Sequence, residues 1–268
     1  MALPRLHGVM DKFNDKIKFV WQNILDIIFP IECLGCKQEG EWICKDCLKT
    51  VPVNFTSHCL ECKQETDFGE FCRECKNKYN LDGVLIASDY NNKLVAQAIK
   101  TLKYRFAYDI GQELARLLIL FIEQEQGQIK SAEWLNSFLS ARPFAPAILQ
   151  NMETALIMPV PLYPRRQRWR GFNQAEILAR QVAEHFRATL EAKNLQRIRP
   201  TRDQASLGKE DRQSNVADSF AWRGENLALK NIILVDDVVT TGATLESCAA
   251  VLKEAGAGEV WGLVVAKG

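Results

Sequence analysis

From residue 81 onward, short apolar runs alternate with segments in which apolar residues recur every three or four positions. The short runs predict strands at residues 82–90, 155–160, 231–235 and 259–266. The periodic segments predict helices at residues 92–104, 110–125, 173–190 and 242–255. Strands that alternate with helices are typical of a parallel sheet covered on both faces, so the pattern predicts an α/β fold.

Two segments depart from this alternation. Residues 1–30 carry an apolar stripe at helical spacing, which predicts an amphipathic helix docked on the rest of the protein. The stripe consists of Phe13, Ile17, Val20, Trp21, Ile24, Leu25 and Ile28. Because Asp11, Asp15 and Asp26 interrupt the segment, it resembles neither a secretory signal nor a transmembrane span, and we expect a cytoplasmic protein. Residues 126–153 carry weaker signals and are interpreted as an insertion with a short helix.

Residues 31–78 contain little aliphatic periodicity but eight of the nine cysteines. These eight form four Cys-x2-Cys turns: Cys33 and Cys36, Cys44 and Cys47, Cys59 and Cys62, Cys72 and Cys75. One such turn offers two thiolates to one ion, and two turns complete a tetrahedron, so the spacing predicts two Zn²⁺ sites. Four thiolates leave no position for water, and we therefore expect both sites to be structural.

The four turns can be combined into two sites in more than one way. Sequential use joins the first turn with the second, whereas a cross-braced arrangement joins the first with the third. The short spacer between Cys36 and Cys44 favours sequential use. Disulfides would need an oxidising compartment, and four turns in series are not typical of a redox motif. His58 is interpreted as a solvated residue and Cys248 as a small core residue.

Composition becomes informative only when it is considered by segment. The chain of 268 residues is 47% hydrophobic and 25% charged, which excludes disordered, collagenous and multi-pass membrane classes. The net charge of +1 conceals an arginine-rich stretch that also contains Trp169 and Phe172. Its basic residues are Arg165, Arg166, Arg168 and Arg170, followed by Arg197, Arg199, Arg202, Lys209 and Arg212. Arginine suits pyrophosphate or a nucleic-acid backbone, and interleaved aromatic rings are typical of single-strand binding. A solvated charged loop is the alternative.

Residues 232–245, IILVDDVVTTGATL, combine acidic and hydroxylated side chains in one contiguous unit. We expect an apolar strand to end in Asp236 and Asp237, followed by a loop that opens a helix. The N–H groups of a helix start, the small Gly242 and the threonine hydroxyls suit a phosphate. The two carboxylates would repel phosphate, so they suit ribose hydroxyls, directly or through a divalent ion. Neither a Walker loop nor a dinucleotide fingerprint is present.

The segment VDDVVTTGAT at 235–244 resembles the signature of type I phosphoribosyltransferases, which bind 5-phosphoribosyl-1-pyrophosphate. Three further segments and the Cys-rich N-terminus resemble the ComF family of competence proteins. The segments are LKYR at 102–105, PVPLYPRRQRWRGFNQAEILAR at 159–180 and TRDQASLGKEDRQSNVADSF at 201–220. The resemblance implies a double zinc ribbon at 31–78 and a phosphoribosyltransferase-like domain at 79–268.

The resemblance also implies roles for single residues. Asp236 and Asp237 would form the catalytic acid pair that holds the ribose hydroxyls. The 5-phosphate loop would consist of Val238, Val239, Thr240, Thr241, Gly242, Ala243 and Thr244. Residues 161–172 would take the place of the pyrophosphate loop, and residues 201–216 that of a mobile loop. Pyrophosphate or a DNA backbone would be bound by Arg165, Arg166, Arg168, Arg170, Arg202 and Arg212.

Two functions are compatible with these residues. In the first, an enzyme binds phosphoribosyl pyrophosphate with Mg²⁺, and a nitrogen nucleophile displaces the pyrophosphate. In the second, a non-catalytic protein retains the fold and binds single-stranded DNA or a partner in the competence machinery. The family resemblance implies a role in DNA uptake or processing during natural competence, and fold alone does not choose between the two functions.

Overall fold

The computed structural model describes residues 31–53, 58–103, 109–126, 146–200 and 218–268. The chain divides into two compact units, Met1–Leu48 and Lys49–Gly268, which are described separately. The helix expected at residues 1–30 and the loop expected at 201–216, with Arg202 and Arg212, lie outside the described residues. Within the described ranges, no helix has the length and apolar run that crossing a bilayer requires.

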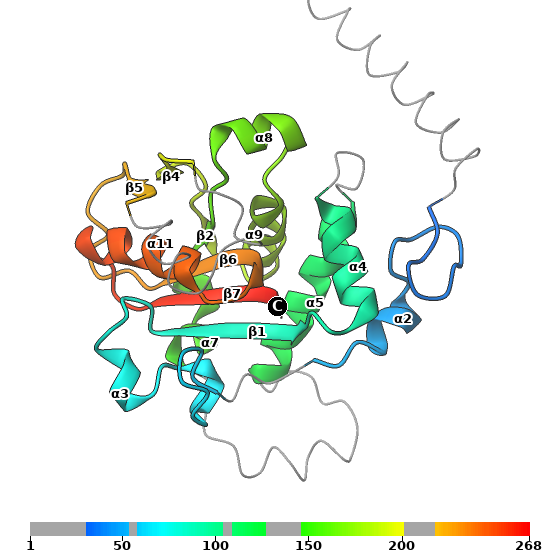
Figure 1. The fold of residues 1–268 in the computed structure, drawn as a ribbon, viewed down its shortest axis with the longest axis horizontal. Helices are drawn as coiled ribbons and strands as arrows, with labels where there is room; N and C mark the ends of the chain where they lie inside the picture. Colours follow the sequence, from blue (N-terminus) through cyan, green and yellow to red (C-terminus); the bar gives the residue numbers. More distant parts are fainter. Residues whose placement is uncertain (1–30, 54–57, 104–108, 127–145, 201–217) are drawn as a thin grey trace, which may run out of the picture. The chain divides into compact units, whose positions relative to one another are not determined.

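The larger unit contains a five-stranded sheet, as the alternating pattern predicts (Figure 1). In spatial order its strands are β1 (Gly83–Asp89), β7 (Val260–Lys267), β6 (Ile232–Val239), β2 (Leu156–Pro159) and β3 (Thr189–Leu190). Every neighbouring pair is parallel. All residues of β7 except the last are buried, because a central strand of a parallel sheet is covered on both faces. The predicted α/β class is therefore confirmed.

Helices cover the two faces of the sheet. The larger ones are α4 (Lys93–Leu102), α5 (Ile110–Glu125), α9 (Gln174–His185) and α11 (Ala243–Glu254), and short turns lie at α7 (Ala147–Gln150) and η2 (Met152–Thr154). α5 packs against α9, and α9 packs against β2 and β6. α11 packs against β7. These four larger helices confirm the helices that were predicted from the segments with apolar residues at helical spacing.

One face of the sheet shares its core with the second group of cysteines. Val84 and Ile86 of β1 belong to the same buried cluster as Leu245 of α11, which also contains Cys59 and Cys72. Cys248 of α11 is fully buried in this cluster, so the expectation of a core residue is confirmed. The second cysteine group is thus built into the core of the larger unit.

The structure corrects three expectations about local structure. β6 continues through Asp236 and Asp237 to Val239, because its partner β7 continues beside it as far as Lys267; the acids lie on a strand and not in a turn. The helix expected at 173–190 ends at His185, and Thr189–Leu190 forms the edge strand β3. Residues 164–170, expected as part of a loop, form helix α8 (Pro164–Arg170).

Two short strands were not predicted. β4 (Leu195–Arg197) and β5 (Phe220–Trp222) form an antiparallel pair outside the main sheet. β5 packs against α11. The pair fixes the two chain segments on either side of residues 201–217.

Short helical turns accompany the cysteines. In the N-terminal part, α2 (Lys45–Lys49) begins between Cys44 and Cys47. In the larger unit, η1 (Asp67–Gly69) precedes α3 (Arg73–Lys76), which begins directly after Cys72. A thiolate turn followed by a short helix thus occurs in both groups.

Candidate functional site

The eight clustered cysteines form two groups of four. The groups are Cys33, Cys36, Cys44 and Cys47, and Cys59, Cys62, Cys72 and Cys75. In each group all ligand atoms lie within 4.8 Å of one another. The sequential combination of turns is therefore confirmed, and the second group consists of cysteines without His58, which is exposed.

The geometry of both groups fits a tetrahedral Zn²⁺ ion. The Sγ atoms of Cys36 and Cys44 lie 3.6 Å apart, and those of Cys62 and Cys72 lie 3.5 Å apart. A Zn–S distance of about 2.3 Å places tetrahedral sulfurs about 3.8 Å from one another, close to these values. Zinc would be held by these eight residues and would supply structural cross-links.

The electrostatics of the cysteine groups also suit a cation. Burial disfavours the Cys33 thiolate, but N–H donors from Cys44, Cys36 and Gly35 outweigh it and lower the pKa of Cys33 to about 6. Hydrogen bonding with Cys44, together with burial and the other thiols, raises the pKa of Cys47 to about 12. Sulfurs this close repel one another as thiolates unless a cation lies between them.

The second cysteine group contacts the turn that precedes α11. Leu60 lies between Cys59 and Cys62 and is 7% exposed. Gly242 is the N-cap of α11 and has φ +79°, and a Cβ added to it would lie 2.6 Å from Cδ2 of Leu60. A larger residue is therefore disfavoured at this position by the backbone conformation and by the contact with Leu60.

Gly242→Ala is expected to lower the free energy of unfolding more than Gly171→Ala does. Both glycines have positive φ, which costs alanine about 1–2 kcal/mol, but no atom lies within 4 Å of a Cβ at Gly171. Chemical denaturation should therefore show that Gly242→Ala lowers the free energy of unfolding by more than Gly171→Ala does. In a double-mutant cycle, Leu60→Ala should abolish this difference. An equal decrease in the free energy of unfolding for Gly242→Ala and Gly171→Ala would contradict the contact between position 242 and Leu60.

A cavity of about 240 Å³ lies at the carboxyl ends of β2 and β6. It is lined by Lys103, Val160, Pro161, Leu162, Arg166, Arg170, Gln174, Arg197, Asp236, Asp237, Val238, Thr240 and Thr244. Ligands of open α/β sheets bind at this end of the strands. The structure thus brings the acid pair, two loop threonines and three arginines to one cavity.

The acid pair is held at the end of β6 by short backbone contacts. The Asp237 N–H donates to Oδ1 of Asp236 at 2.8 Å, and the Val238 N–H donates to Oδ1 of Asp237 at 3.0 Å. Nζ of Lys103 lies 3.5 Å from Oδ2 of Asp237. Burial and the neighbouring Asp237 carboxylate raise the pKa of Asp236 well above its ordinary value. Two adjacent carboxylates in this position are stabilised by a cation.

Several buried polar atoms of the cavity lack a hydrogen-bond partner, although Oδ2 of Asp237 keeps its ion pair with Lys103. Among the described residues, no hydrogen-bond partner is present for Nε and Nη1 of Arg170, Oε1 of Gln174 or Oδ2 of Asp237. Burial lowers the pKa of Arg170, while the charge of Asp237 raises it. Buried polar groups are normally satisfied, so these atoms indicate a polar ligand.

The start of α11 adds donors to the same cavity. The N-cap Gly242 makes no side-chain cap hydrogen bond, and the helix has 12 residues. The first N–H groups of such a helix attract an anion. Thr240 and Thr244 line this cavity, whereas Thr241 and Ala243 line a different one beside Tyr79, and Val239 is buried. The 5-phosphate loop of the sequence prediction is thus divided between two cavities and the core.

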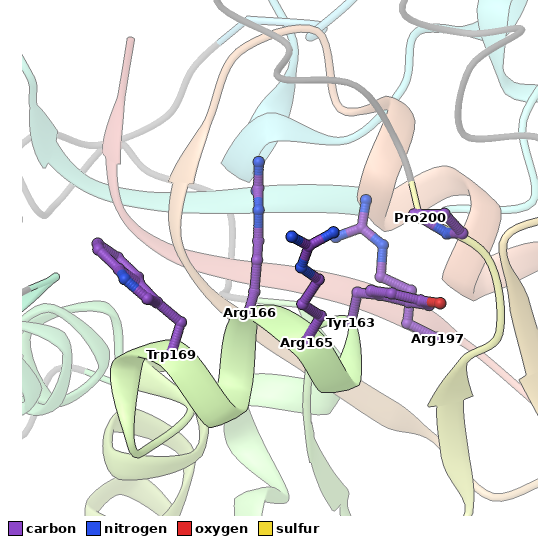
Figure 2. A pocket seen from close by; sticks show the side chains of 6 residues that line it. All are labelled: Tyr163, Arg165, Arg166, Trp169, Arg197 and Pro200. Carbon is purple, nitrogen blue, oxygen red and sulfur yellow. The ribbon is translucent and has the colours of Figure 1, made fainter.

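The arginines of α8 are also divided between two cavities and the exposed surface. Arg166 and Arg170 line the cavity with the acid pair, while Arg165 lines a neighbouring cavity (Figure 2). Arg168 is exposed and is not among the described residues that line either cavity. Lys103 and Gln174 are site residues that sequence reasoning did not assign. Both residues lie in segments that resemble the ComF family, Lys103 in LKYR at 102–105 and Gln174 in the segment at 159–180.

Comparison with known proteins agrees with this geometry. Residues 170–267 match the family model of the phosphoribosyl transferase domain. This range contains Arg170, Gln174, Arg197 and the acid pair. The chain therefore contains a domain of the phosphoribosyltransferase class.

Relatives cover most of the chain. It is 28% identical over 247 residues to competence protein F of Haemophilus influenzae, which covers 88% of this chain and 97% of that protein. It is 29% identical over 240 residues to DNA utilization protein YhgH of Salmonella typhi, covering 87% and 96%. It is 25% identical over 228 residues to competence protein ComFC of Streptococcus pneumoniae, covering 84% and 87%. These homologues confirm the resemblance to the ComF family.

Proposed function

We propose that the larger unit binds 5-phosphoribosyl-1-pyrophosphate with Mg²⁺ in the cavity at the end of β6. One observation carries this proposal: buried polar atoms of Arg170 and Gln174 without a hydrogen-bond partner line a cavity that also contains the acid pair and the start of α11. A ligand with both phosphate groups and hydroxyl groups satisfies cationic donors and carboxylate acceptors together. The match of residues 170–267 to the phosphoribosyl transferase domain supports this ligand class.

Each part of the ligand has a partner of suitable chemistry in the cavity. Asp236 and Asp237 accept hydrogen bonds from the ribose hydroxyls. The N–H groups at the start of α11, with Thr240 and Thr244, bind the 5-phosphate. Arg166 and Arg170 pair with the pyrophosphate. When bound, Mg²⁺ neutralises charge on the pyrophosphate, and the acid pair offers the carboxylate oxygens that this ion prefers.

We propose that this ligand is used in DNA uptake or processing during natural competence. The support is that relatives over most of the chain carry the names competence protein F, ComFC and DNA utilization protein. The test of the ligand is calorimetry with phosphoribosyl pyrophosphate and Mg²⁺, on the wild type and on a variant without the acid pair.

A second candidate function, binding of single-stranded DNA without catalysis, is favoured by the surface of α8. This helix has no buried residue, and Trp169 on it is 67% exposed between basic neighbours. Arg165 and Arg168 are exposed on the same helix. An exposed indole and guanidinium groups suit bases that stack and phosphates that follow the strand.

If single-stranded DNA binds at α8, Arg165→Gln with Arg168→Gln is expected to reduce the salt dependence of its binding. Each phosphate contact to a single strand contributes about 0.7 to the slope of log K against log salt, so the slope should fall by about 1.4. Fluorescence anisotropy of a labelled oligonucleotide at several salt concentrations measures it. The control removes two exposed arginines elsewhere, Arg116→Gln with Arg180→Gln. An identical slope in all three proteins would exclude α8 as the DNA surface.

A further inference from the structure

The first turns of the two cysteine groups share one sequence pattern and one backbone conformation. Residues 32–39 have the sequence ECLGCKQE, and residues 58–65 have the sequence HCLECKQE. In both turns the N–H of the first cysteine donates to the glutamine carbonyl at 2.8 Å. The lysine after the second cysteine has φ +67° in one turn and +66° in the other. Each turn therefore carries a leucine, Leu34 or Leu60, at the same position of the same backbone.

The leucine of the second turn packs against the start of α11. Leu60 belongs to the buried cluster that also contains Ala243 and Leu245. Its Cδ2 atom approaches Gly242 so closely that a Cβ on the glycine would lie 2.6 Å away. The carbonyl of Gly242 accepts the first hydrogen bond of the helix, from the N–H of Glu246 at 2.9 Å. Leu60 therefore supports the residue from which α11 begins.

A second contact holds the first turn of the same helix. The carboxylate of Glu246 accepts hydrogen bonds from the Asn80 N–H at 2.9 and 3.1 Å, from Nδ2 of Asn80 at 2.7 Å and from the Leu81 N–H at 3.1 Å. Asn80 and Leu81 follow Cys75, the last cysteine of the second group, along the chain. The segment that carries the second group thus holds α11 at Gly242 and again one turn later.

The start of α11 is also the part of the cavity that offers N–H donors and threonine hydroxyls to an anion. Thr240 and Thr244 line the cavity on either side of Gly242 along the chain. Hydrogen bonds weaken steeply when the donor is displaced or turned away from the acceptor, so these donors act together only in a fixed arrangement. Gly242 has no side chain that could anchor the turn. Its position therefore depends on what packs against it, and Leu60 is the side chain that does so.

We propose that Leu60 is a positioning residue for the anion-binding turn, and that through it the second cysteine group and the ligand cavity are coupled. This inference rests on the proposed binding of phosphoribosyl pyrophosphate. Zinc in the second group would fix Cys59 and Cys62, which flank Leu60, and so keep the leucine against Gly242. Coupling is reciprocal, so a ligand that binds more tightly to the zinc-loaded protein also makes that protein bind zinc more tightly. The first group lies in the other compact unit and takes no part.

Calorimetry with phosphoribosyl pyrophosphate and Mg²⁺ on the full chain tests the positioning role. Leu60→Ala keeps all eight clustered cysteines and is expected to weaken ligand affinity about 10-fold, a typical size for coupling between sites. Leu60→Met keeps an apolar side chain of similar volume and should bind the ligand like the wild type. Leu34→Ala is the matched control from the first turn and should also bind like the wild type. A leucine with a structural role alone would lower the Tm of Leu60→Ala and leave its affinity unchanged, which would overturn the proposal.

Zinc affinity gives a second readout that needs no catalytic activity. Cys44→Ser breaks the first group, so competition with a zinc-selective chelator then reports on the second group. Saturating phosphoribosyl pyrophosphate and Mg²⁺ should raise the chelator concentration that removes half of this zinc about 10-fold. With Leu60→Ala added, and at equal saturation with ligand, the chelator concentration should rise by less than 3-fold, about half of that effect on a logarithmic scale. An equal rise in both proteins would show that ligand and zinc are linked through overall folding, and would overturn the role of Leu60.

The two experiments separate a failure of this inference from a failure of the proposed function. If phosphoribosyl pyrophosphate binds the wild type and Leu60→Ala equally, the ligand site stands and only the positioning role is wrong. If it binds neither the wild type nor Leu34→Ala, the proposed function is wrong and the inference is overturned with it. Leu60→Val, a smaller truncation, replaces Leu60→Ala in both experiments if the alanine variant does not fold. Weaker ligand binding together with a smaller change in zinc affinity supports the coupling.

Discussion

Asp236→Asn with Asp237→Asn is expected to abolish calorimetric heat from phosphoribosyl pyrophosphate and Mg²⁺, with affinity at least about 100-fold weaker than in the wild type, or about 2.7 kcal/mol. The carboxylates are the only acidic side chains among the described residues that line this cavity. An amide keeps their shape but accepts more weakly, and because it carries no charge it binds a divalent ion much less strongly. The variant thus weakens both the hydrogen bonds to the ribose and the binding of the metal.

The same variant should remain folded. Burial and the charge of Asp237 raise the pKa of Asp236, which means that its charged form is disfavoured in the folded protein. A neutral amide removes that penalty, and the Tm is expected to be equal to or above that of the wild type. Glu153→Gln with Glu184→Gln removes two exposed carboxylates and serves as the control. Equal heats from the wild type and the acid-pair variant would contradict the assignment of this cavity.

Cys72→Ser is expected to lower the Tm of the larger unit by at least about 10 °C. Cys72 is 6% exposed and belongs to the buried cluster that contains Val84, Ile86 and Leu245. The substitution removes one of the four cysteine ligands of the second group. A zinc ion in this group would cross-link the core and contribute folding free energy directly, and the variant would lose that contribution. Thermal unfolding followed by circular dichroism measures the effect.

Cys44→Ser is the matched control for this substitution. It removes one ligand from the first group of cysteines, which lies in the other compact unit, so the Tm of the larger unit should stay close to that of the wild type. Zinc analysis should give two ions per chain for the wild type and one for each variant. If Cys72→Ser does not yield folded protein, chelator titration of the wild type should show two steps, with unfolding tied to one of them. Equal stability of the two variants would contradict the structural role of the second site.

The periodic segments predicted most of the fold because their apolar faces are the ones that the sheet buries. The limits of this reasoning are clear at β6. Asp residues are rare in strands, so Asp236 and Asp237 suggested a turn, but pairing with β7 extends the strand beyond them. Pairing between distant segments leaves no local signal, and this also explains why β4 and β5 were not expected.

Helix α8 was missed for a different reason. None of its residues is buried, so it carries no apolar stripe from which a helix could be recognised. Its boundaries did leave a signal, because Pro164 occupies the first turn and Gly171 ends the helix with φ +88°. Pro164 and Gly171 could therefore have been used to predict helix α8 from the sequence.

The candidate site was partly predictable from the sequence. The cysteine spacing was sufficient to predict both groups of four, since ligands of one ion are close in the chain. The acid pair and the threonines were recognised for the same reason. The cavity also needs Lys103 from the end of α4 and Gln174 from α9, and these residues meet Asp237 only after the sheet has formed.

The order of strands has a consequence for how the protein is made. β7 is the last of the five strands to be synthesised, yet it lies between β1 and β6. In this sheet β1 pairs with β7 and with no other strand. During translation the backbone N–H and C=O groups along β1 therefore lack their partner strand in this sheet until Val260–Lys267 has left the ribosome. The complete sheet is thus expected to form only after β7 has been synthesised and inserted between β1 and β6.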